Sequence, residues 1–535
     1  MSDITRREFI NFMGISAAAA GTLPWLIQCA SKAVRPLGPP LPFVPLKSSL
    51  EDALLLPEGF SYEVILRWRQ QLNTKGELFG FNNDFIAYLP FKPSDPNDGL
   101  MWVNHEYHDP YYVSDWRPGT PRTDEQFRLE RKAVGGSIVH MRKYEGRWQM
   151  VDNSKYNRRL DAYTPIPLIS QRPILGHRTA VGTFANCAGG VTPWGTVLTC
   201  EENYDNFVGE AIYKNGVRTW VDGDDYLSWA KGVKLPPEHY GWVVEVNLKT
   251  GHAKKLCALG RFAHECATCT VAPDGRVVVY SGDDAENEHL YKFISRKAGS
   301  LEEGSLYVAD LKAGRWVHLS WRDDARLKKV FSDHTELLIR AREAAKIVGA
   351  TPLDRPEDIE IDPVSGHIFV SLTSNKKRKN YFGSLLKIME KNNNPLSLEF
   401  DSATFAAGGA ETGFACPDNL VFDKKGNLWM TTDISGSALK TDPYKPFGNN
   451  GLFYIPLRGE GAGIAVQVAS APNGAELTGP CFAPDGKTLF LSVQHPGERA
   501  HVRDNMKSSW PDGGTSTPAP CVVAISGSAL DSLLN

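Results

Sequence analysis

Several features that would assign a function class at once are scarce in this chain of 535 residues. Its 59 lysines and arginines are offset by 62 aspartates and glutamates, so the net charge is −3, which argues against nucleic acid as the main partner. Its nine cysteines are scattered, unlike the dense disulfide framework of a small domain. The lone Cys-x-x-Cys motif, Cys266 to Cys269, has no second pair and is interpreted as part of a buried strand rather than a zinc site.

Helical patterns are equally sparse. Apolar residues recur at helical spacing over residues 333–349, with Asp333 as N-cap and Gly349 as the stop, and we expect this helix to lie outside the main fold. The 48 glycines and 35 prolines indicate many turns and favour strands. Residues 34–50 form a Pro-rich leader, and no comparable linker follows, so one domain over residues 51–535 is predicted.

The N-terminal stretch is typical of an export signal. Arg6 and Arg7 precede a mainly apolar run over residues 10–27, which predicts a twin-arginine (Tat) signal peptide over residues 1–33 and a periplasmic or secreted protein. The run contains glycines and a serine, so it is a poor stable membrane span. Cys29 offers an alternative, lipoprotein anchoring, although Gln28 before it is bulky where small residues are usual.

A loose repeat then runs through the chain. Six times, a turn containing glycine leads into a short β-rich run that ends in polar or acidic residues. A turn followed by a strand, once per unit, is typical of propeller blades, so we predict an all-β fold: a six-bladed β-propeller with inserted loops and a few peripheral helices. The runs end near His105-Glu106, Glu201-Glu202, Asp283-Asp284, Thr373, Asp433 and Gln494-His495.

Radial symmetry would bring these distant strand ends together near the central channel. Several carboxylates held close together repel one another and resist ionisation, and cations remove that conflict. The alternative interpretation is that the acidic residues cap strands at a solvated rim.

One stretch, residues 186–203, places a cysteine near the candidate carboxylate ligands. Cys187 lies beside a Gly-Gly pair, and the strand that follows ends at Glu201 and Glu202. A thiolate next to carboxylates suits a mixed site, with one ion that accepts sulfur and others that prefer oxygen. The alternative is a buried structural cysteine and a solvated glutamate pair.

Further segments give the chain a resemblance to a known family, the PhoX-type alkaline phosphatases, which are exported bacterial enzymes that depend on iron and calcium. The resemblance spans about residues 55–500. It rests on these segments: Asn186-Cys-Ala-Gly-Gly, Thr192-Pro-Trp-Gly-Thr, Cys200-Glu-Glu-Asn, Gly260-Arg-Phe-Ala-His-Glu265, Gly282-Asp-Asp284, Arg355-Pro-Glu-Asp358, Pro417-Asp-Asn-Leu, Gly426-Asn-Leu-Trp, Gly479-Pro-Cys-Phe-Ala-Pro-Asp-Gly-Lys-Thr-Leu-Phe and Gln494-His-Pro-Gly497.

The resemblance implies a six-bladed propeller with iron (Fe³⁺) and calcium (Ca²⁺) ions on its axis. By the same resemblance Cys187 is the iron-ligating cysteine. A phosphate-binding arginine of the family would map to Arg378, in a loop (374–385) that is shorter here than in the family. The expected metal ligands are Cys187, Glu106, Glu201, Glu202, Glu265, Asp283, Asp284, Glu357 and Asp418.

The function predicted on this basis is hydrolysis of small phosphate monoesters by a monomer, with a metal-bound oxo or hydroxide group as the nucleophile. The Tat export machinery is the expected partner, and neither nucleic acid nor a stable membrane span is expected. Two alternatives stay open. One is a calcium-only propeller hydrolase of the lactonase or phytase kind; the other is a non-catalytic binding or scaffold propeller whose calcium is structural.

Overall fold

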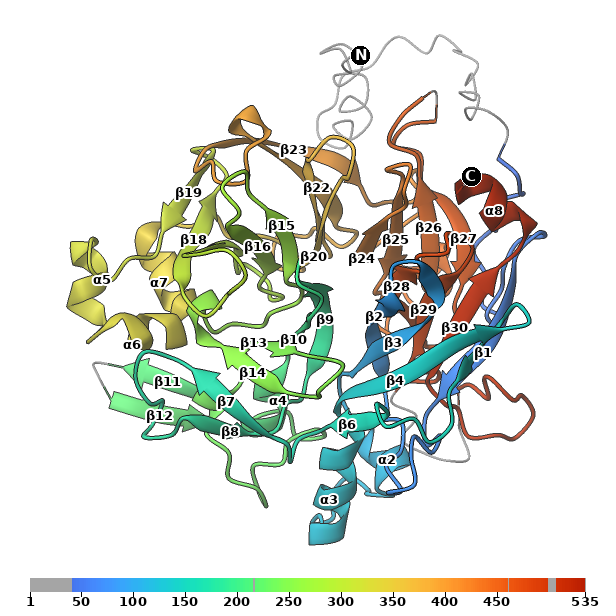
Figure 1. Cartoon of the computed structure of the whole chain (residues 1–535), viewed down its shortest axis with the longest axis horizontal. Coiled ribbons are helices and arrows are strands. Elements are labelled where there is room, and N and C mark those ends of the chain that lie inside the picture. Colours follow the sequence, from blue (N-terminus) through green and yellow to red (C-terminus); the bar gives the residue numbers. More distant parts are fainter. Residues whose placement is uncertain (1–40, 215–216, 460, 499–506, 535) are drawn as a thin grey trace. The chain divides into compact units, whose positions relative to one another are not determined.

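The computed structural model describes residues 41–214, 217–459, 461–498 and 507–534. The predicted signal peptide and Cys29 lie outside these residues, as does the first part of the Pro-rich leader. The described chain is mostly strand with few helices and forms the predicted six-bladed β-propeller (Figure 1). None of its helices has the length and hydrophobicity needed to traverse a bilayer.

The first three blades follow one another along the chain. Blades 1 and 3 begin with the strand nearest the axis, whereas two outer strands precede the inner strand of blade 2. Blade 1 holds β2 (Asn83–Lys92), β3 (Asp95–His105), β4 (Gly135–Tyr144) and β5 (Arg147–Met150), with β6 (Arg158–Leu160) also on β4. Blade 2 holds β9 (Asn186–Val191), β10 (Val197–Glu201), β13 (Val243–Val246), β14 (Ala253–Leu256), β7 (Pro165–Ile169) and β8 (Thr179–Val181). Blade 3 holds β15 (Thr268–Val271), β16 (Val277–Gly282), β17 (Leu290–Ser295), β18 (Gly304–Asp310) and β19 (Arg315–His318).

The last three blades are simpler, with four strands each. Blade 4 holds β20 (Pro356–Ile361), β21 (Ile368–Leu372), β22 (Ser384–Glu390) and β23 (Phe400–Ala407). Blade 5 holds β24 (Pro417–Phe422), β25 (Leu428–Thr432), β26 (Gly451–Ile455) and β27 (Val466–Ser470). Blade 6 holds β28 (Glu476–Phe482), β29 (Leu489–Gln494), β30 (Cys521–Ser526) and β1 (Ser61–Arg67).

The ring closes through the pairing of β1 with β30. The two strands run antiparallel, with Ser61 opposite Ser526 and Arg67 opposite Cys521. The outermost strand of blade 6 therefore comes from the N-terminal side of the described chain and its other strands from the C-terminal side. Separating β1 from β30 would expose the edge of a strand within blade 6, which is unfavourable.

The six predicted turn-strand repeats are the second strands of the blades, β3, β10, β16, β21, β25 and β29. Every residue of the last five is buried, because each of these strands is covered on both faces by neighbouring blades. The hydrophobic core is correspondingly divided among the interfaces between blades. Between blades 5 and 6, for example, Trp429 and Leu452 pack with Leu477 and Leu489.

The helices lie between strands, except α8, which follows the last strand. Blade 1 carries α2 (Pro110–Val113) and α3 (Asp124–Ala133), and blade 2 carries α4 (Tyr204–Val208), η1 (Pro237–His239), η2 (Cys257–Leu259) and the ribbon of β11 (Glu210–Lys214) and β12 (Val217–Val221). The others are α5 (Ala325–Val330), α6 (His334–Ile339), α7 (Ala341–Val348), η3 (Lys391–Asn393), η4 (Lys445–Phe447) and α8 (Ser528–Leu534).

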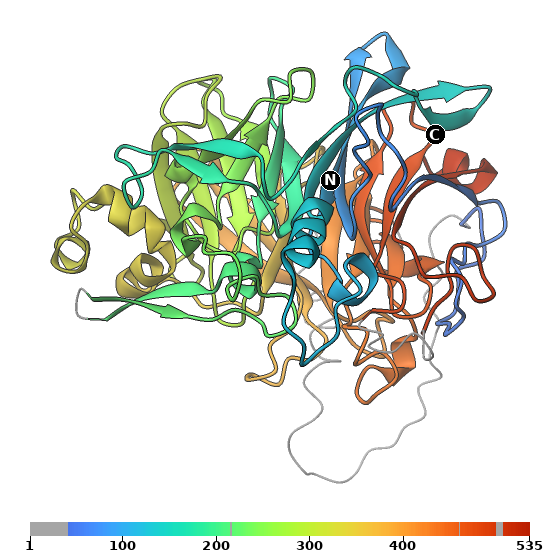
Figure 2. The same cartoon turned by 90° about the horizontal axis from the view of Figure 1, so that it is seen from below.

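The helix predicted over residues 333–349 is present, but as two helices rather than one. Asp333 caps α6 by accepting a hydrogen bond from the Glu336 backbone, and Gly349 ends α7 in the left-handed conformation, as predicted. Between them Arg340 leaves helical geometry (φ −111°, ψ 40°), which breaks the continuous helix. Both helices lie outside the blades, beyond β18 and β19 (Figures 1 and 2).

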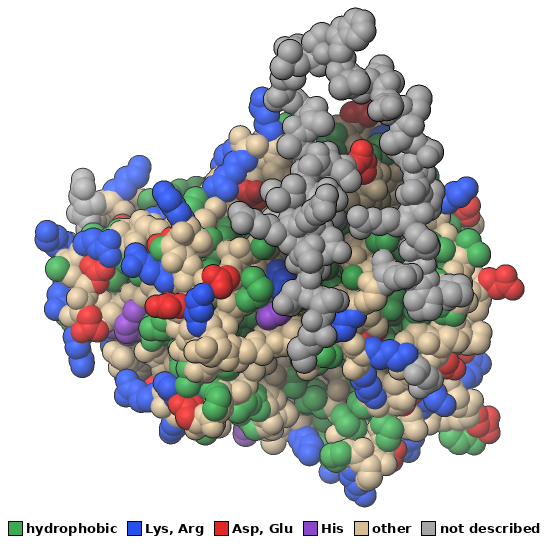
Figure 3. Space-filling model, turned by 90° about the horizontal axis from the view of Figure 1, so that it is seen from above, with side chains coloured by type: hydrophobic (Ala, Val, Ile, Leu, Met, Phe, Trp, Pro, Cys, Tyr) green, Lys and Arg blue, Asp and Glu red, His purple; other side chains and the backbone are tan. Residues whose placement is uncertain are grey.

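The described cysteines form no disulfide framework and the surface has mixed charge, as the sequence predicts. The eight cysteines in the described ranges are free, and Cys266 and Cys269 lie just before and within β15, with Cys266 fully buried. The face in Figure 3 mixes acidic and basic side chains, as the small net charge implies.

Replacing Trp429 tests the interface between blades 5 and 6. Its fully buried ring makes edge contacts with Tyr454 and Phe482 at centroid distances of 5.2 and 5.5 Å. Trp429→Ala should lower the free energy of unfolding by about 3–5 kcal/mol, measured by denaturant titration. Val364→Ala, at a 61% exposed turn residue, is the control. A loss of only about 0.5 kcal/mol at Trp429, as at a surface site, would contradict this packing.

Candidate active site

The inner strands of the blades surround the axis. In chain order β2, β9, β15, β20, β24 and β28 each contact the next, and β28 contacts β2 again. Side chains at equivalent heights on these strands therefore converge on one central space, although they come from positions 84 to 478 of the sequence.

A β-bulge at the start of four inner strands aims one side chain at that space. In each strand the register shifts just after the first residue, and the second residue lies inside the bulge. A bulge leaves one residue out of the ladder and redirects its side chain. The four residues so placed are Asp84 of β2, Cys187 of β9, Glu357 of β20 and Asp418 of β24.

A second tier comes from the ends of the repeat strands. Glu106, Glu202 and Asp433 follow directly after β3, β10 and β25, and Asp284 lies just beyond β16. Adjacent residues on a strand point to opposite faces. Only one residue of the pair Glu201-Glu202, and one of the pair Asp283-Asp284, can therefore face the axis.

These two tiers line a cavity of about 290 Å³. It contains most of the ligands predicted from the sequence: Glu106, Cys187, Glu202, Glu265, Asp284, Glu357 and Asp418. The other lining residues are Asp84, Tyr107, Asn203, Asn206, Phe207, Leu227, Arg355, Asp433, Ser435, Glu476, Thr478, Gln494, His495 and Glu498.

Three predicted site residues do not line this cavity. Glu201 is fully buried and accepts a hydrogen bond of 2.6 Å from the Lys255 ammonium. Asp283 accepts hydrogen bonds from the Arg342 guanidinium, at 2.9 Å from Nε. Arg378 pairs with Asp354 at 3.0 Å in an exposed loop. Each charge is thus already balanced elsewhere, and we leave all three out of the proposed site.

Sequence reasoning missed Asp84 and Arg355 as site residues. Asp84 opens the first blade at the position that Cys187, Glu357 and Asp418 occupy in later blades, and aligning the inner strands would have found it. Arg355 stood in a quoted motif, but its side chain was not assigned a role. It is the lone lysine or arginine in the cavity lining among the described residues.

Arg355 joins three of the acidic residues. Its guanidinium binds both carboxylate oxygens of Asp284 at 2.8 Å, and lies 2.8 Å from Glu357 and 3.5 Å from Asp433. Its backbone has φ 55°, a left-handed conformation that is strained for a residue with a side chain and is found at functional sites.

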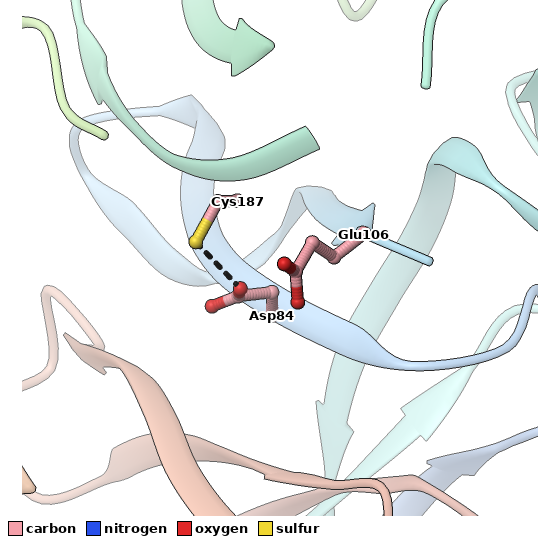
Figure 4. A group of neighbouring side chains, drawn as sticks. All are labelled: Asp84, Glu106 and Cys187. Atoms are coloured by element: carbon pink, nitrogen blue, oxygen red, sulfur yellow. Dashed lines mark hydrogen bonds between the residues drawn. The ribbon is translucent and has the colours of Figure 1, made fainter. Parts of the chain in front are cut away.

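Cys187 links the carboxylates into a chain of overlapping groups. Its Sγ lies 3.1 Å from Asp84 Oδ2 (Figure 4). It also lies 3.1 Å from Glu265 Oε1. Three sets of side chains have donor atoms within 4.8 Å of one another: Asp84, Glu106 and Cys187; Cys187, Glu202 and Glu265; Glu265, Asp284 and Glu357. Cys187 and Glu265 each belong to two of these sets, so each side chain could bridge two neighbouring ions.

Because these carboxyl groups are buried close together, their negative charges repel one another and their ionisation is disfavoured. Loss of hydration raises the pKa of Asp84 to about 7, and loss of hydration together with neighbouring carboxylates raises the pKa of Glu202 and Glu265 well above the usual range. The same two causes raise the pKa of the Cys187 thiol. Burial also acts on Asp433, but hydrogen bonding from Glu476 and the charge of Arg355 lower its pKa.

The donor set fits metal ions. Glu265 Oε2 is buried and has no hydrogen-bond partner within the described chain. Such an oxygen is costly unless something binds it. A shared thiolate suits an ion that accepts sulfur, and the surrounding carboxylates suit hard cations such as Ca²⁺.

The conflict predicts an unusual pH dependence of stability for protein stripped of metal ions. An acid whose pKa is raised in the folded state binds more protons there than in the unfolded state, so unfolding free energy falls as pH rises. For Asp84 the unfolding free energy falls as the pH rises from the ordinary pKa of an aspartate to about 7. Calorimetry of chelator-treated protein should show Tm falling from about pH 5 to pH 8, with recovery on adding Ca²⁺. A Tm that rises over this interval would contradict the prediction.

The comparisons with known proteins agree with the geometry. The chain is 30% identical to Pseudomonas fluorescens PhoX, whose structure was solved in complex with vanadate, a transition state analogue. The match covers 91% of this chain and 98% of that chain, with a TM-score of 0.81. A protein of unknown function from Dyadobacter fermentans is 10% identical, covers 88% of this chain and 100% of its own, and has a TM-score of 0.36, too low to inform function.

Among curated protein sequences no match was found. The family model of alkaline phosphatase PhoX, however, matches residues 41–497, which is most of the chain. The chain therefore belongs to the PhoX family of alkaline phosphatases, which are phosphomonoester hydrolases.

Proposed function

We propose that this protein hydrolyses phosphate monoesters in the periplasm with iron and calcium ions held on the propeller axis. The observation that carries the proposal is the position of Cys187, whose thiol sits 3.1 Å from both Asp84 and Glu265 inside a buried ring of carboxylates. Buried carboxylates at this density need cations to stay ionised, and a sulfur donor among them favours a transition metal such as iron.

The proposed ligands are the cavity residues that the strands aim inward: Asp84, Glu106, Cys187, Glu202, Glu265, Asp284, Glu357 and Asp418. When bound, the ions would supply Lewis acidity toward phosphoryl oxygens and would acidify water, which provides a nucleophile without a serine. This matters because the described cavity lining offers one serine, Ser435, whose hydroxyl pairs with the Ser437 hydroxyl at 3.1 Å.

Arg355 is the proposed phosphate-binding residue in place of Arg378. Its guanidinium lines the cavity and is held by Asp284 and Glu357, so its position is fixed before substrate arrives. A fixed cation that stabilises charge developing on phosphoryl oxygens costs no reorganisation during the reaction. The vanadate bound by the Pseudomonas relative is consistent with a phosphoryl site in this cavity.

The periplasmic location follows from the twin arginines of the leader, Arg6 and Arg7, and the proposed substrate is a small soluble ester. A calcium-only hydrolase or a non-catalytic calcium propeller remains the alternative. Both would leave Cys187 without a role as a ligand, so the cysteine decides between them and the proposal.

Replacing Cys187 tests the iron. Cys187→Ala should lose most of the bound iron, the visible sulfur-to-iron absorption band and activity on p-nitrophenyl phosphate together. Cys187→Ser, which keeps an oxygen donor, should lose the band while retaining part of the metal. Wild-type metal content and turnover in Cys187→Ala would show that the thiol is not an essential ligand.

Replacing Arg355 tests the phosphate site. Arg355→Ala should lower kcat/KM for p-nitrophenyl phosphate about 10²–10³-fold, because one fixed charge donor to the phosphoryl oxygens is lost. Arg378→Ala is the matched control and should change kcat/KM about twofold or less, since its guanidinium pairs with Asp354 outside the cavity. The reverse ranking of the two variants would return the role to Arg378.

Removing calcium should abolish turnover. Treatment with a calcium-selective chelator is expected to inactivate the enzyme, and added Ca²⁺ should restore it better than Mg²⁺. The smaller ion demands six near-ideal octahedral ligands, whereas Ca²⁺ accepts irregular carboxylate sets. Activity that survives exhaustive chelation, with calcium absent by elemental analysis, would contradict the proposal.

A further inference from the structure

Asp283 lies directly behind two of the proposed metal ligands. It precedes Asp284 in the sequence, and an isolated β-bridge pairs it with His264, which precedes Glu265. Its carboxylate is fully buried but does not line the cavity. A buried charge is costly unless it is paired and hydrogen-bonded, so the partners of Asp283 indicate what this charge does here.

The Asp283 carboxylate fastens together the two segments that carry these ligands. Its Oδ1 accepts a hydrogen bond from the Ala263 backbone N–H at 3.2 Å. The Asp284 N–H donates in turn to the Ala263 carbonyl at 3.0 Å. The Glu265 N–H donates to the Gly282 carbonyl at 3.2 Å. The two segments therefore form one tied unit, and a displacement of Asp283 would disturb both ligands.

The third ligand of this set is packed tightly against the same unit. A Cβ atom added to Gly282 would lie 2.1 Å from the Pro356 carbonyl oxygen and 2.5 Å from the Glu357 carbonyl oxygen, so the backbones approach closely. Glu265, Asp284 and Glu357 have donor atoms within 4.8 Å of one another. All three are carboxylates, which suits a hard cation such as Ca²⁺.

A helix outside the blades, α7, supplies the cation that pairs with Asp283 (Figure 1). Arg342 of this helix donates to both carboxylate oxygens, from Nε to Oδ2 at 2.9 Å and from Nη2 to Oδ1 at 2.5 Å. Lys346, one turn later on the same side of α7, pairs with Glu288 at 2.5 Å. The helix therefore holds the segment after β16 at two points, and the first of them lies at the ligand-bearing residues.

The position of α7 is itself fixed by packing. Its fully buried Ala341 belongs to the same apolar cluster as Phe262, which lies three residues before the ligand Glu265. The neighbouring helix α6 is bound to the same segment, because its Leu338 carbonyl accepts a hydrogen bond from the Arg261 backbone N–H at 2.9 Å. The charge that reaches Asp283 is therefore carried by an element with a fixed position.

We propose that Arg342 is a positioning residue for the metal centre. Through Asp283 it fixes the separation of the Glu265 and Asp284 carboxylates. The helical insertion that carries Arg342 thereby braces the carboxylate set that, together with Glu357, would bind Ca²⁺. The inference rests on the proposed function, because the ions are part of that proposal.

Replacing Arg342 tests the brace through calcium binding. Chelator-treated protein is dialysed against graded concentrations of free Ca²⁺, and bound calcium is counted by elemental analysis. Arg342→Ala should need about 10–100-fold more free Ca²⁺ than wild type to bind its last calcium ion, because its ligands are no longer held at the right separation. At saturating Ca²⁺ its kcat on p-nitrophenyl phosphate should return close to the wild-type value, since the ligands themselves are intact.

Two further variants keep the test valid if Arg342→Ala folds poorly. Arg342→Lys keeps the charge but loses the bidentate contact, so its calcium requirement should lie between those of wild type and Arg342→Ala. The double variant Arg342→Met/Asp283→Asn removes both charges together, which avoids an unpaired buried carboxylate, and should show the same raised requirement. Lys346→Ala is the matched control: it breaks the other ion pair of α7 with this segment and should bind calcium as wild type does.

The outcomes separate this proposal from the proposed function. If Arg342→Ala and the double variant bind calcium like wild type, and only the Tm of the metal-free protein falls, the pair is merely structural. The positioning role is then overturned while the phosphatase stands. If the wild-type protein binds no calcium and hydrolyses no phosphate ester, the proposed function fails and the positioning role fails with it.

Discussion

Everything in this structure depends on a ring of like charges that the fold forces together. Radial symmetry brings side chains from all parts of the sequence to one axis, and the blades bury them where water cannot screen their repulsion. Asp84, with a pKa raised to about 7, shows the cost of holding a carboxyl group there. A protein can afford this arrangement only if something positive occupies the centre, so the charge pattern itself argues for metal ions.

The propeller holds the inner strands in place and directs their side chains toward the axis. Apolar interfaces between successive blades fix the distance of each inner strand from the axis, and the pairing of β1 with β30 closes the ring. The bulges then turn one residue per strand inward, at Asp84, Cys187, Glu357 and Asp418.

Much of the fold could be predicted from the sequence, because the turn-strand repeat is local. The site was harder. The strand-end acids Glu106, Glu202 and Asp284 were found through that repeat, but it cannot say which of two adjacent acids faces the axis, and Glu201 and Asp283 turned out to pair with Lys255 and Arg342. Asp84 was missed because it lies on an inner strand, outside the turn-strand repeat, and only an alignment of the inner strands would have revealed it. Arg355 was missed as a site residue because two of its three partners, Asp284 and Asp433, are distant in sequence.

The central claim is that a sulfur-ligated iron ion sits on the propeller axis. The most direct measurement is anomalous X-ray scattering at the iron absorption edge, on crystals of the active protein purified without added metal. The account predicts an anomalous peak bonded to the Cys187 sulfur and surrounded by the carboxylates of the inner strands. Fully active crystals with no iron peak at Cys187, or with iron elsewhere in the molecule, would contradict it.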